Sequence, residues 1–294
     1  MEEALLKLKK SLEGELEWDD LHKKLYATDA SVYKMTPLAV AFPKNKNDLR
    51  QLISFALAHN TSLIPRTAGT SLAGQCVGSG IVVDVSKYFT EILNLDVENR
   101  TVTVQPGVNR DALNRFLEPH GLFFGPNTST SQYCLLGGMF GNNSSGTTSI
   151  RYGVTRDVVI AVETLLSDGS EATFKACDSK ELETKLKNNT QEGKIYHFLF
   201  EALSNPKVQK AITTDFPDAS VHRRNTGYAV DVLLNQHPLN PQGEAFNIAK
   251  LLAGSEGTLA LTTAMTFSLV PIPPKHSVML ALHFNSIQEA MLAV

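Results

Sequence analysis

Residues 65–75, which do most to specify the fold, read Pro-Arg-Thr-Ala-Gly-Thr-Ser-Leu-Ala-Gly-Gln. A short strand, Ser62 to Pro65, is predicted to run into this stretch, and the proline takes the following residues out of the sheet. Gly69 and Gly74 tolerate a positive φ, so the backbone can curve with its N–H groups turned inward. Such a nest binds a phosphate-type anion without side-chain charge. The stretch therefore predicts an anion site, to which Arg66 adds a charged donor or a local ion pair.

Two better-known phosphate loops do not match this stretch. Gly69 and Gly74 have the G-x-x-x-x-G spacing of a P-loop, but Gln75 and Cys76 stand where Lys and Ser/Thr are needed. The dinucleotide fingerprint G-x-G-x-x-G is absent, because residues 78–80 run straight into an apolar segment. An NTPase and a Rossmann site are therefore disfavoured. A glycine-rich surface turn without a ligand stays open on this loop alone, because glycine patterns are weak evidence.

Composition excludes several classes of protein. The 294 residues, 43% of them apolar, can bury one or two cores, and a net charge of -3 without a Lys/Arg run argues against a nucleic-acid partner. No apolar run approaches the ~18 residues of a membrane span. Met1 to Lys10 lacks the apolar core of a signal peptide, so we expect a cytoplasmic protein, or one peripheral to the inner face of the membrane. Cys76, Cys134 and Cys177 are too far apart for a zinc or iron–sulfur site, and no metal is expected.

Helical and strand patterns alternate along the chain. Helices are expected at Met1–Glu13, Trp18–Tyr26, Asp48–His59, Asn109–Glu118, Ser179–Leu203 and Ala245–Leu252. Strands are expected at Ser62–Pro65, Ile81–Val85, Ile92–Leu95, Thr101–Gln105, Val158–Leu166, Glu171–Phe174 and Thr258–Leu269. After a proline-rich linker, Ser277–Phe284 is expected to start a new strand and Ser286–Val294 a new helix.

Two further glycine-rich segments accompany the first. Residues 125–152 show little periodicity and are too long for an ordinary connection, which is typical of a functional loop. Their glycines at 137, 138, 141 and 146 permit close approach to a flat ligand, and apolar residues at 135–140 indicate a packed segment, although a flexible linker stays open. The third segment, Gly254 to Leu259, is a tight turn that opens a strand. Its Glu256 is more typical of a solvated or capping carboxylate than of a catalytic one.

Taken in this order, the three segments resemble the FAD-linked oxidase family, with the FAD-binding domain of the vanillyl-alcohol oxidase and p-cresol methylhydroxylase (PCMH) type. The most similar branch of that family holds a subunit of glycolate oxidase, the D-lactate dehydrogenases and D-2-hydroxyglutarate dehydrogenase. Residues 65–75 are similar to its pyrophosphate loop and residues 137–146 to its flavin loop. The match continues through Arg151-Tyr152-Gly153, Asp157, Asp168-Gly169, Asn225-Thr226-Gly227-Tyr228 and Gly254-Ser255-Glu256-Gly257-Thr258.

The resemblance implies an α+β fold with FAD between two lobes, a small mixed lobe and a larger, mostly antiparallel one. It gives an N-terminal helical segment at 1–36 and the PCMH-type domain at 37–274, with lobes at about 37–95 and 96–274. Residues 275–294 would start a truncated cap domain. The residues expected to bind the cofactor are Pro65, Arg66, Thr67, Ala68, Gly69, Thr70, Ser71, Gln75, Pro126, Thr128, Ser131, Gly137, Gly138, Asn142, Ser145, Asp157, Ile160, Glu256 and Gly257.

Two departures from the family pattern matter. Covalent members often carry a histidine in the pyrophosphate loop, and Thr70 takes that place here, so the resemblance implies non-covalent FAD. The catalytic groups of this branch come largely from the cap domain, so the catalytic residues stay unassigned. Arg223, Arg224 and Tyr228 are candidate edge contacts, although a surface pair of arginines and a packed tyrosine is the simpler interpretation.

The implied activity is FAD-dependent oxidation of a D-2-hydroxy acid, such as lactate, glycolate or 2-hydroxyglutarate, with hydride transfer to flavin N5 and a separate electron acceptor. One alternative is a flavin-binding subunit or fragment without activity of its own, completed by a cap domain or by a partner chain that carries iron–sulfur clusters. A third interpretation is a reductase of the cell-wall nucleotide-sugar type on the same scaffold.

Overall fold

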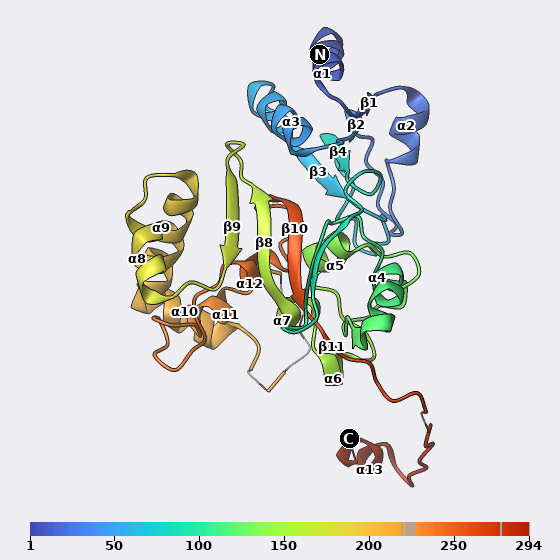
Figure 1. Cartoon of the computed structure of the whole chain (residues 1–294), viewed down its shortest axis with the longest axis vertical. Helices are drawn as coiled ribbons and strands as arrows, with labels where there is room; N and C mark the ends of the chain where they lie inside the picture. The colour runs from blue at the N-terminus through green and yellow to red at the C-terminus, as the bar shows by residue number, and fades with distance from the viewer. Residues whose placement is uncertain (219, 222–223, 225–226, 277, 294) are drawn as a thin grey trace.

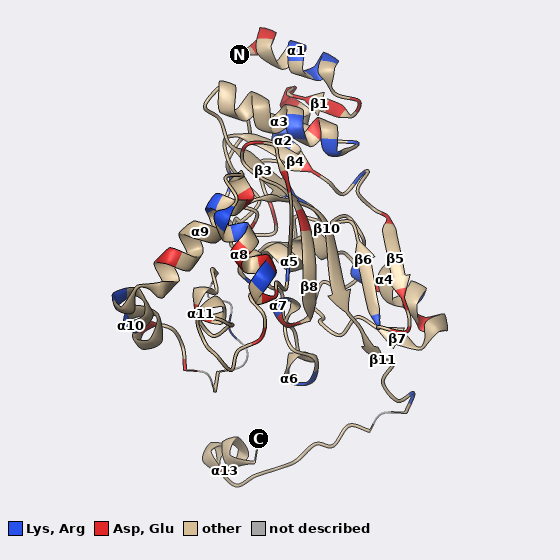
Figure 2. Cartoon of the chain, turned by 60° about the vertical axis from the view of Figure 1, so that its left-hand side comes forward, with Lys and Arg blue, Asp and Glu red and all other residues tan. Residues whose placement is uncertain are grey.

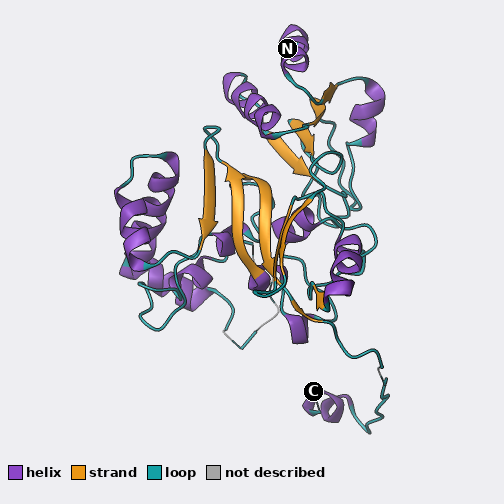
Figure 3. Cartoon of the chain, viewed as in Figure 1, coloured by secondary structure: helices purple, strands orange, loops and turns teal. Residues whose placement is uncertain are grey.

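The computed structural model of the chain describes residues 1–294 apart from 219, 222–223, 225–226, 277 and 294. Helices alternate with strands that form a four-stranded sheet, a five-stranded sheet and a two-stranded pair (Figures 1 and 3). This arrangement confirms the predicted α+β class.

The strands are β1 (Glu15–Glu17), β2 (Ala39–Phe42), β3 (Leu63–Arg66), β4 (Ile81–Asp84), β5 (Ile92–Asp96), β6 (Thr101–Val104), β7 (Leu122–Phe123), β8 (Val159–Leu165), β9 (Glu171–Lys175), β10 (Leu261–Ser268) and β11 (Val270–Pro271). The helices are α1 (Glu2–Ser11), α2 (Asp20–Leu25), α3 (Lys46–Ala58), α4 (Arg110–Leu117), the 3-10 turn η1 (Glu118–His120), α5 (Leu136–Asn142), α6 (Ser149–Tyr152), α7 (Thr155–Val158), α8 (Ser179–Lys187), α9 (Gln191–Ser204), α10 (Pro206–Asp215), α11 (Val230–Leu234), α12 (Ala249–Leu252) and α13 (Ile287–Leu292).

The first sheet has the strand order β1-β2-β4-β3, and β2, β4 and β3 run parallel. Helix α3 joins β2 to β3. It begins where the side chain of Asn45 accepts a hydrogen bond from the N–H of Asp48, and it buries Leu49 and Leu52 against the sheet. No helix joins β3 to its parallel neighbour β4, although the connection must run back along the length of the strand and is usually a helix. Residues 67–80 make that return as a loop, and this loop is the glycine-rich stretch.

The second sheet has the order β5-β6-β10-β8-β9 and is antiparallel throughout. Helices α8, α9 and α10 lie beside β9 and β8, and α4 and α5 lie toward the opposite edge (Figure 1). The core between this sheet and these helices contains large, completely buried side chains, namely Phe124, Phe174, Tyr196, Phe246 and Phe267. Lys, Arg, Asp and Glu are interspersed on α1, α2 and α8, whereas β8 and β10 carry few of them (Figure 2).

The two sheets meet where β8 and β10 approach the first core. Leu165 at the end of β8 and Leu261 at the start of β10 pack among the residues of the first sheet's core. The turn that precedes β10 is thereby brought next to the loop that follows β3. Segments far apart in the sequence therefore lie together at this junction. Arg66 and Glu256, for example, are 190 residues apart in the chain.

Several expected elements differ in the structure. The N-terminal segment 1–36, expected to be helical, also contains β1, which pairs antiparallel with β2. Strand β5 belongs to the second sheet, so the chain leaves the first sheet before Ile92 rather than near Leu95.

The helical regions differ as well. The expected helix Ser179–Leu203 is two helices, α8 and α9, and helix α10 follows. The expected helix at Ala245–Leu252 shortens to α12, because residue Phe246 bridges to Cys177 in extended backbone. The expected strand at 277–284 is wrong for residues 278–284, which are exposed and form no strand pairing, whereas α13 does lie in the expected helix 286–294.

Candidate functional site

A cavity of about 600 Å³ lies at the junction of the two sheets. Its walls are the loop after β3, the segment around α5, and the turn before β10. Most of the sequence-predicted site residues line it, namely Pro65, Arg66, Thr67, Gly69, Thr70, Ser71, Gln75, Thr128, Gly137, Gly138, Asn142, Ser145, Glu256 and Gly257. The three glycine-rich segments singled out in the sequence thus form one site.

The loop after β3 takes the curved conformation that its glycines predict. Gly69 and Gly74 have φ values of +66° and +75°, in the region that residues with a Cβ rarely adopt. The hydroxyl of Ser71 accepts hydrogen bonds from the backbone N–H groups of Ala73 and Gln75, both at 3.4 Å. The loop therefore holds its curve by its own backbone and hydroxyl groups.

Arg66 supports this loop from its outer side. Its Nη1 donates to the carbonyl of Thr28 at 2.8 Å, and its guanidinium lies 5.0 Å from the ring centre of Tyr26. The Ala30 N–H also donates to the Gly69 carbonyl at 3.2 Å. A Cβ added to Gly69 would lie 2.5 Å from Arg66 Nη2, so the glycine is what allows the guanidinium this close. Arg66 was predicted to be a charged donor to the anion or a member of a local ion pair; these contacts with a carbonyl and an aromatic ring give it a structural role that neither prediction included.

The segment 136–142, expected to be a loop, is the helix α5, and its glycines serve close packing. A Cβ on Gly137 would lie 2.5 Å from Pro106 Cβ, and one on Gly138 would lie 2.6 Å from Thr67 Oγ1. Neither glycine has a positive φ. The missing side chains let α5 pack closely against Pro106 at Gly137 and against the glycine-rich loop, through Thr67, at Gly138.

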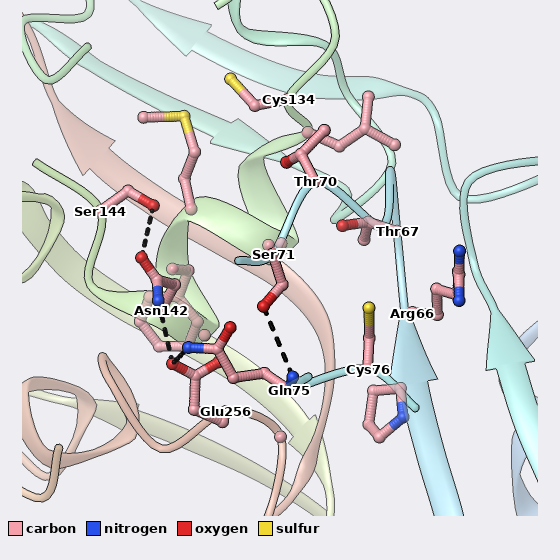
Figure 4. Close-up of a pocket in the computed structure, with 18 of the residues that line it drawn as sticks. Arg66, Thr67, Thr70, Ser71, Gln75, Cys76, Cys134, Asn142, Ser144 and Glu256 are labelled. Atoms are coloured by element: carbon pink, nitrogen blue, oxygen red, sulfur yellow. Dashed lines mark hydrogen bonds between the residues drawn. The ribbon is translucent and has the colours of Figure 1, made fainter. Parts of the chain in front are cut away.

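Glu256 links the three walls. Its Oε1 accepts hydrogen bonds from Gln75 Nε2 at 3.0 Å and from Asn142 Nδ2 at 3.1 Å, and Figure 4 shows the three side chains converging. Burial raises the pKa of the Glu256 carboxyl, against the lowering effect of the two amide donors. The adjacent Gly257 has φ +72°, and a Cβ there would meet Pro65 Cγ at 2.7 Å.

Two thiols line the cavity without being activated. Burial raises the pKa of Cys76 to about 11, and it also raises the pKa of Cys134. Cys76 lies 3.6 Å from a carboxylate oxygen of Asp29, which further disfavours a thiolate. Both groups are therefore protonated near neutral pH and are not nucleophiles.

Five sequence-predicted residues do not line the cavity: Ala68, Pro126, Ser131, Asp157 and Ile160. The Pro126 carbonyl accepts from Arg110, and the Ser131 hydroxyl donates to Asp111. The Asp157 carboxylate accepts from the N–H of Val154 at the start of α7, and the Ile160 carbonyl accepts from Asn247 Nδ2 at 3.0 Å. These groups are committed to local structure, and Ile160 is 37% exposed on β8.

Sequence reasoning missed several lining residues, namely Leu72, Ala73, Cys76, Ser129, Thr130, Cys134, Ser144 and Ser255. Residues 127–131 are all polar, and the sequence gives no way to choose which of their hydroxyls face the cavity. Among the candidate edge contacts, Tyr228 shares a 2.5 Å hydrogen bond with the Thr258 hydroxyl, and Arg224 pairs with Asp231. Arg223 lies outside the described residues, as do Asn225 and Thr226.

Within the described part of the chain, no three His, Cys, Asp or Glu side chains gather as metal ligands would. In the same residues, no helix has both the length and the apolar character needed to cross a bilayer.

Residues 37–175 match the family of the FAD binding domain. The chain is 34% identical over 281 residues to D-2-hydroxyglutarate dehydrogenase of Pseudomonas putida, covering 95% of this chain and 27% of that protein. It is 28% identical to glycolate oxidase subunit GlcD of Bacillus subtilis, covering 89% of this chain and 43% of that one.

The fold is also similar to a solved structure of alkyldihydroxyacetonephosphate synthase, with a TM-score of 0.61 over 93% of this chain and 41% of the other, at 17% identity. The chain thus spans about a quarter of the length of the D-2-hydroxyglutarate dehydrogenases it matches, at 27% in two of them.

Proposed function

We propose that the cavity between the two sheets holds FAD and that the protein oxidises a D-2-hydroxy acid. The premise is that residues 37–175 of this chain belong to the FAD binding domain family, as the sequence resemblance indicated. The observation that carries the proposal is the convergence of the three glycine-rich segments on one cavity.

The cavity fits such a cofactor in size and lining. Its volume of about 600 Å³ lies in the usual range for cofactor sites of roughly 300–1,000 Å³. One part is lined by the curved loop and its hydroxyls, Thr67, Thr70 and Ser71, which suit a pyrophosphate. Another part is backbone of α5 with apolar neighbours such as Met139, which suits a flat ring. A side chain at Gly138 would collide with Thr67 and fill part of this cradle.

The residues expected to contact the cofactor fall into two groups according to their position in the cavity. The loop 65–75 would hold the pyrophosphate and ribityl chain, and Thr128, Gly138, Asn142 and Ser145 would line the flavin. When bound, the flavin supplies the hydride-accepting chemistry, while the protein binds, orients and shields it from water. The flavin domain is proposed to extend over 37–274, with a cap domain beginning in 275–294.

The substrate class follows from the relatives. A D-2-hydroxyglutarate dehydrogenase and a glycolate oxidase subunit are 34% and 28% identical to the chain, so a 2-hydroxy acid and a separate electron acceptor are the proposed partners. Because the chain spans only 27% of the first of these, the second candidate is a flavin-binding chain that needs a cap domain or a partner chain for turnover.

The attachment of FAD is proposed to be non-covalent. Thr70 stands where covalent relatives carry histidine, and its hydroxyl lines the cavity. Acid denaturation should therefore release all flavin into the supernatant, whereas flavin that precipitates with the protein would indicate a covalent bond.

The function is tested by flavin bleaching. Protein loaded with FAD, both as this chain and with the regions that the longer relatives possess, is mixed anaerobically with D-lactate, D-2-hydroxyglutarate or glycolate, and the yellow absorbance is followed. Bleaching by a D-hydroxy acid supports the dehydrogenase, and flavin uptake with bleaching only in the longer form supports the second candidate. A folded protein that takes up no FAD contradicts both, and bleaching by NADPH alone would point to a reductase.

A further inference from the structure

A single carboxylate oxygen joins parts of the cavity wall that come from both sheets. Gln75 lies in the loop between β3 and β4 of the first sheet, and Asn142 is the last residue of α5. Glu256 lies in the turn that leads into β10 of the second sheet. Its Oε1 accepts from both amides, at 3.0 and 3.1 Å, so one atom bridges the two lobes along the cavity (Figure 4).

Backbone hydrogen bonds fix the position of the Glu256 carboxylate. The Glu256 N–H donates to the Gly141 carbonyl at 2.9 Å, and the Gly254 N–H donates to the Phe140 carbonyl at 3.0 Å, which docks the turn on α5. Glu256 has φ +55°, a left-handed conformation that is unfavourable for a residue with a Cβ. Such strain persists where the surroundings fix it, and residues of this kind cluster at functional sites.

The carboxylate also decides which way the two amides face. An ionised carboxylate only accepts hydrogen bonds, so both amides turn their nitrogens toward it and their oxygens away. The Asn142 oxygen then accepts from the Ser144 hydroxyl at 3.1 Å. The Gln75 oxygen lies on the side of Ser71, in the cavity that Gln75 lines, where it can accept from hydroxyl or N–H donors of a ligand (Figure 4).

We propose that Glu256 is a positioning residue of the cofactor site, which ties the glycine-rich loop to α5 and presents the Gln75 oxygen to the bound molecule. This inference rests on the proposed function, in which that molecule is FAD. Glu256 acts through Gln75 and Asn142, and it takes no part in the reaction.

The lobes also touch each other on the outer surface, and this contact offers a matched control. On the outer surface, Lys46 Nζ lies 3.0 Å from a Glu163 oxygen and 3.1 Å from a Glu171 oxygen. These side chains are between 36% and 50% exposed, so solvent screens them and they contribute little. Lys46→Met therefore breaks a contact between the lobes without touching the cavity.

The experiment measures FAD affinity of the apo chain by flavin fluorescence, and its unfolding midpoint, for five variants: E256M, E256Q, Q75M, the double E256M/Q75M, and K46M. E256M and Q75M should each weaken FAD binding about tenfold, as expected for loss of a charge-assisted hydrogen bond in a partly buried site. The double variant should bind within about twofold of the weaker single one, because both changes break one link. E256Q should stay within about threefold of the wild type, since its amide oxygen can still accept from both donors. K46M should bind like the wild type.

Three results would overturn the proposal: additive losses in the double variant, E256Q as weak as E256M, or lower unfolding midpoints with unchanged FAD affinity of the folded protein. The last result assigns a structural role only, and Q75M gives the same test if E256M does not fold. A wild-type chain that takes up no FAD removes the proposed function itself, and the positioning role with it.

Discussion

The two glycine-rich segments that meet in the cavity wall use glycine for different physical reasons. In the loop after β3, Gly69 and Gly74 adopt positive φ and bend the chain. In α5, Gly137 and Gly138 keep helical backbone and instead leave room for Pro106 and Thr67. The same composition thus specifies a bent chain in one segment and a closely packed helix in the other.

The two walls are also stabilised by different parts of the molecule. Besides its own hydrogen bonds, the loop depends on the contacts of Arg66 with Thr28 and Tyr26, neither of which lines the cavity. Helix α5 depends on the buried core, in which Leu136, Met139 and Phe140 are packed. Substitutions in α5 should therefore act through overpacking, and substitutions around the loop should act through backbone strain and the contacts of Arg66.

The largest expected effect comes from Gly137→Ala. The new Cβ would lie 2.5 Å from Pro106 Cβ and 3.0 Å from its carbonyl oxygen, neither of which can move without the backbone. We expect a loss of about 2 kcal/mol in the free energy of unfolding, measured by urea denaturation of the apo chain. The matched control is Gly141→Ala, whose nearest neighbours would lie at 3.7 and 3.9 Å, so helix propensity should make it neutral or stabilising by up to ~1 kcal/mol. Equal destabilisation of the two variants would contradict the packing role of Gly137.

A somewhat smaller effect is expected for Gly69→Ala. The positive φ alone costs about 1–2 kcal/mol for a residue with a Cβ, and the Arg66 guanidinium must also move. Gly121→Ala is the control, because it has φ +69° with nothing within 4 Å of the new Cβ. Both variants should lose similar stability from strain, but only Gly69→Ala should weaken FAD binding. Unchanged FAD affinity in Gly69→Ala would separate the loop from the cofactor.

Removal of the contact between Tyr26 and Arg66 should have a weaker effect on the protein. Tyr26→Leu removes the ring under the Arg66 guanidinium, a contact of about 0.5–1 kcal/mol at exposed sites. We expect FAD affinity to fall by no more than about fivefold, although Tyr26 does not line the cavity. Tyr26→Phe keeps the ring and loses only the hydrogen bond from its hydroxyl to Asp84, so it should bind FAD more tightly than Tyr26→Leu. The reverse order would show that stacking on Arg66 does not support the loop.

The smallest expected effect is a pH dependence at Glu256. Burial raises its pKa in the folded chain above the ordinary 4.5, so the folded state binds the proton more tightly than the unfolded state. The stability that the protonated carboxyl contributes is fully present below pH 4.5 and is lost as pH rises through the raised value. The free energy of unfolding is measured in urea from pH 4.5 to 7 for the wild type and for Glu256→Gln. The difference, wild type minus variant, should therefore fall as the pH rises. A difference that rises with pH would mean that the two amide donors outweigh burial.

The sequence predicted the loop better than the helix, and the reason is physical. Positive φ at Gly69 is a local property, and the strand ending at Pro65 signals it. The close approach of Gly137 to Pro106 depends on tertiary packing, so α5 has no sequence signal beyond apolar residues among glycines, which suppress helix propensity. The sequence also did not distinguish residues that line the cavity from those that do not, such as Thr130 and Ser131, because this difference too depends on tertiary packing. Glu256 was predicted from a motif, but its amide partners come from segments more than 100 residues away and leave no local pattern.

The decisive experiment is titration of FAD into the folded apo chain. We expect saturable uptake of one FAD per chain with visible flavin absorbance, weakened in Gly69→Ala and unchanged in Gly121→Ala. A folded chain that shows no uptake, or one whose uptake is the same in both alanine variants, would contradict the assignment of the cavity between the two sheets as the FAD site.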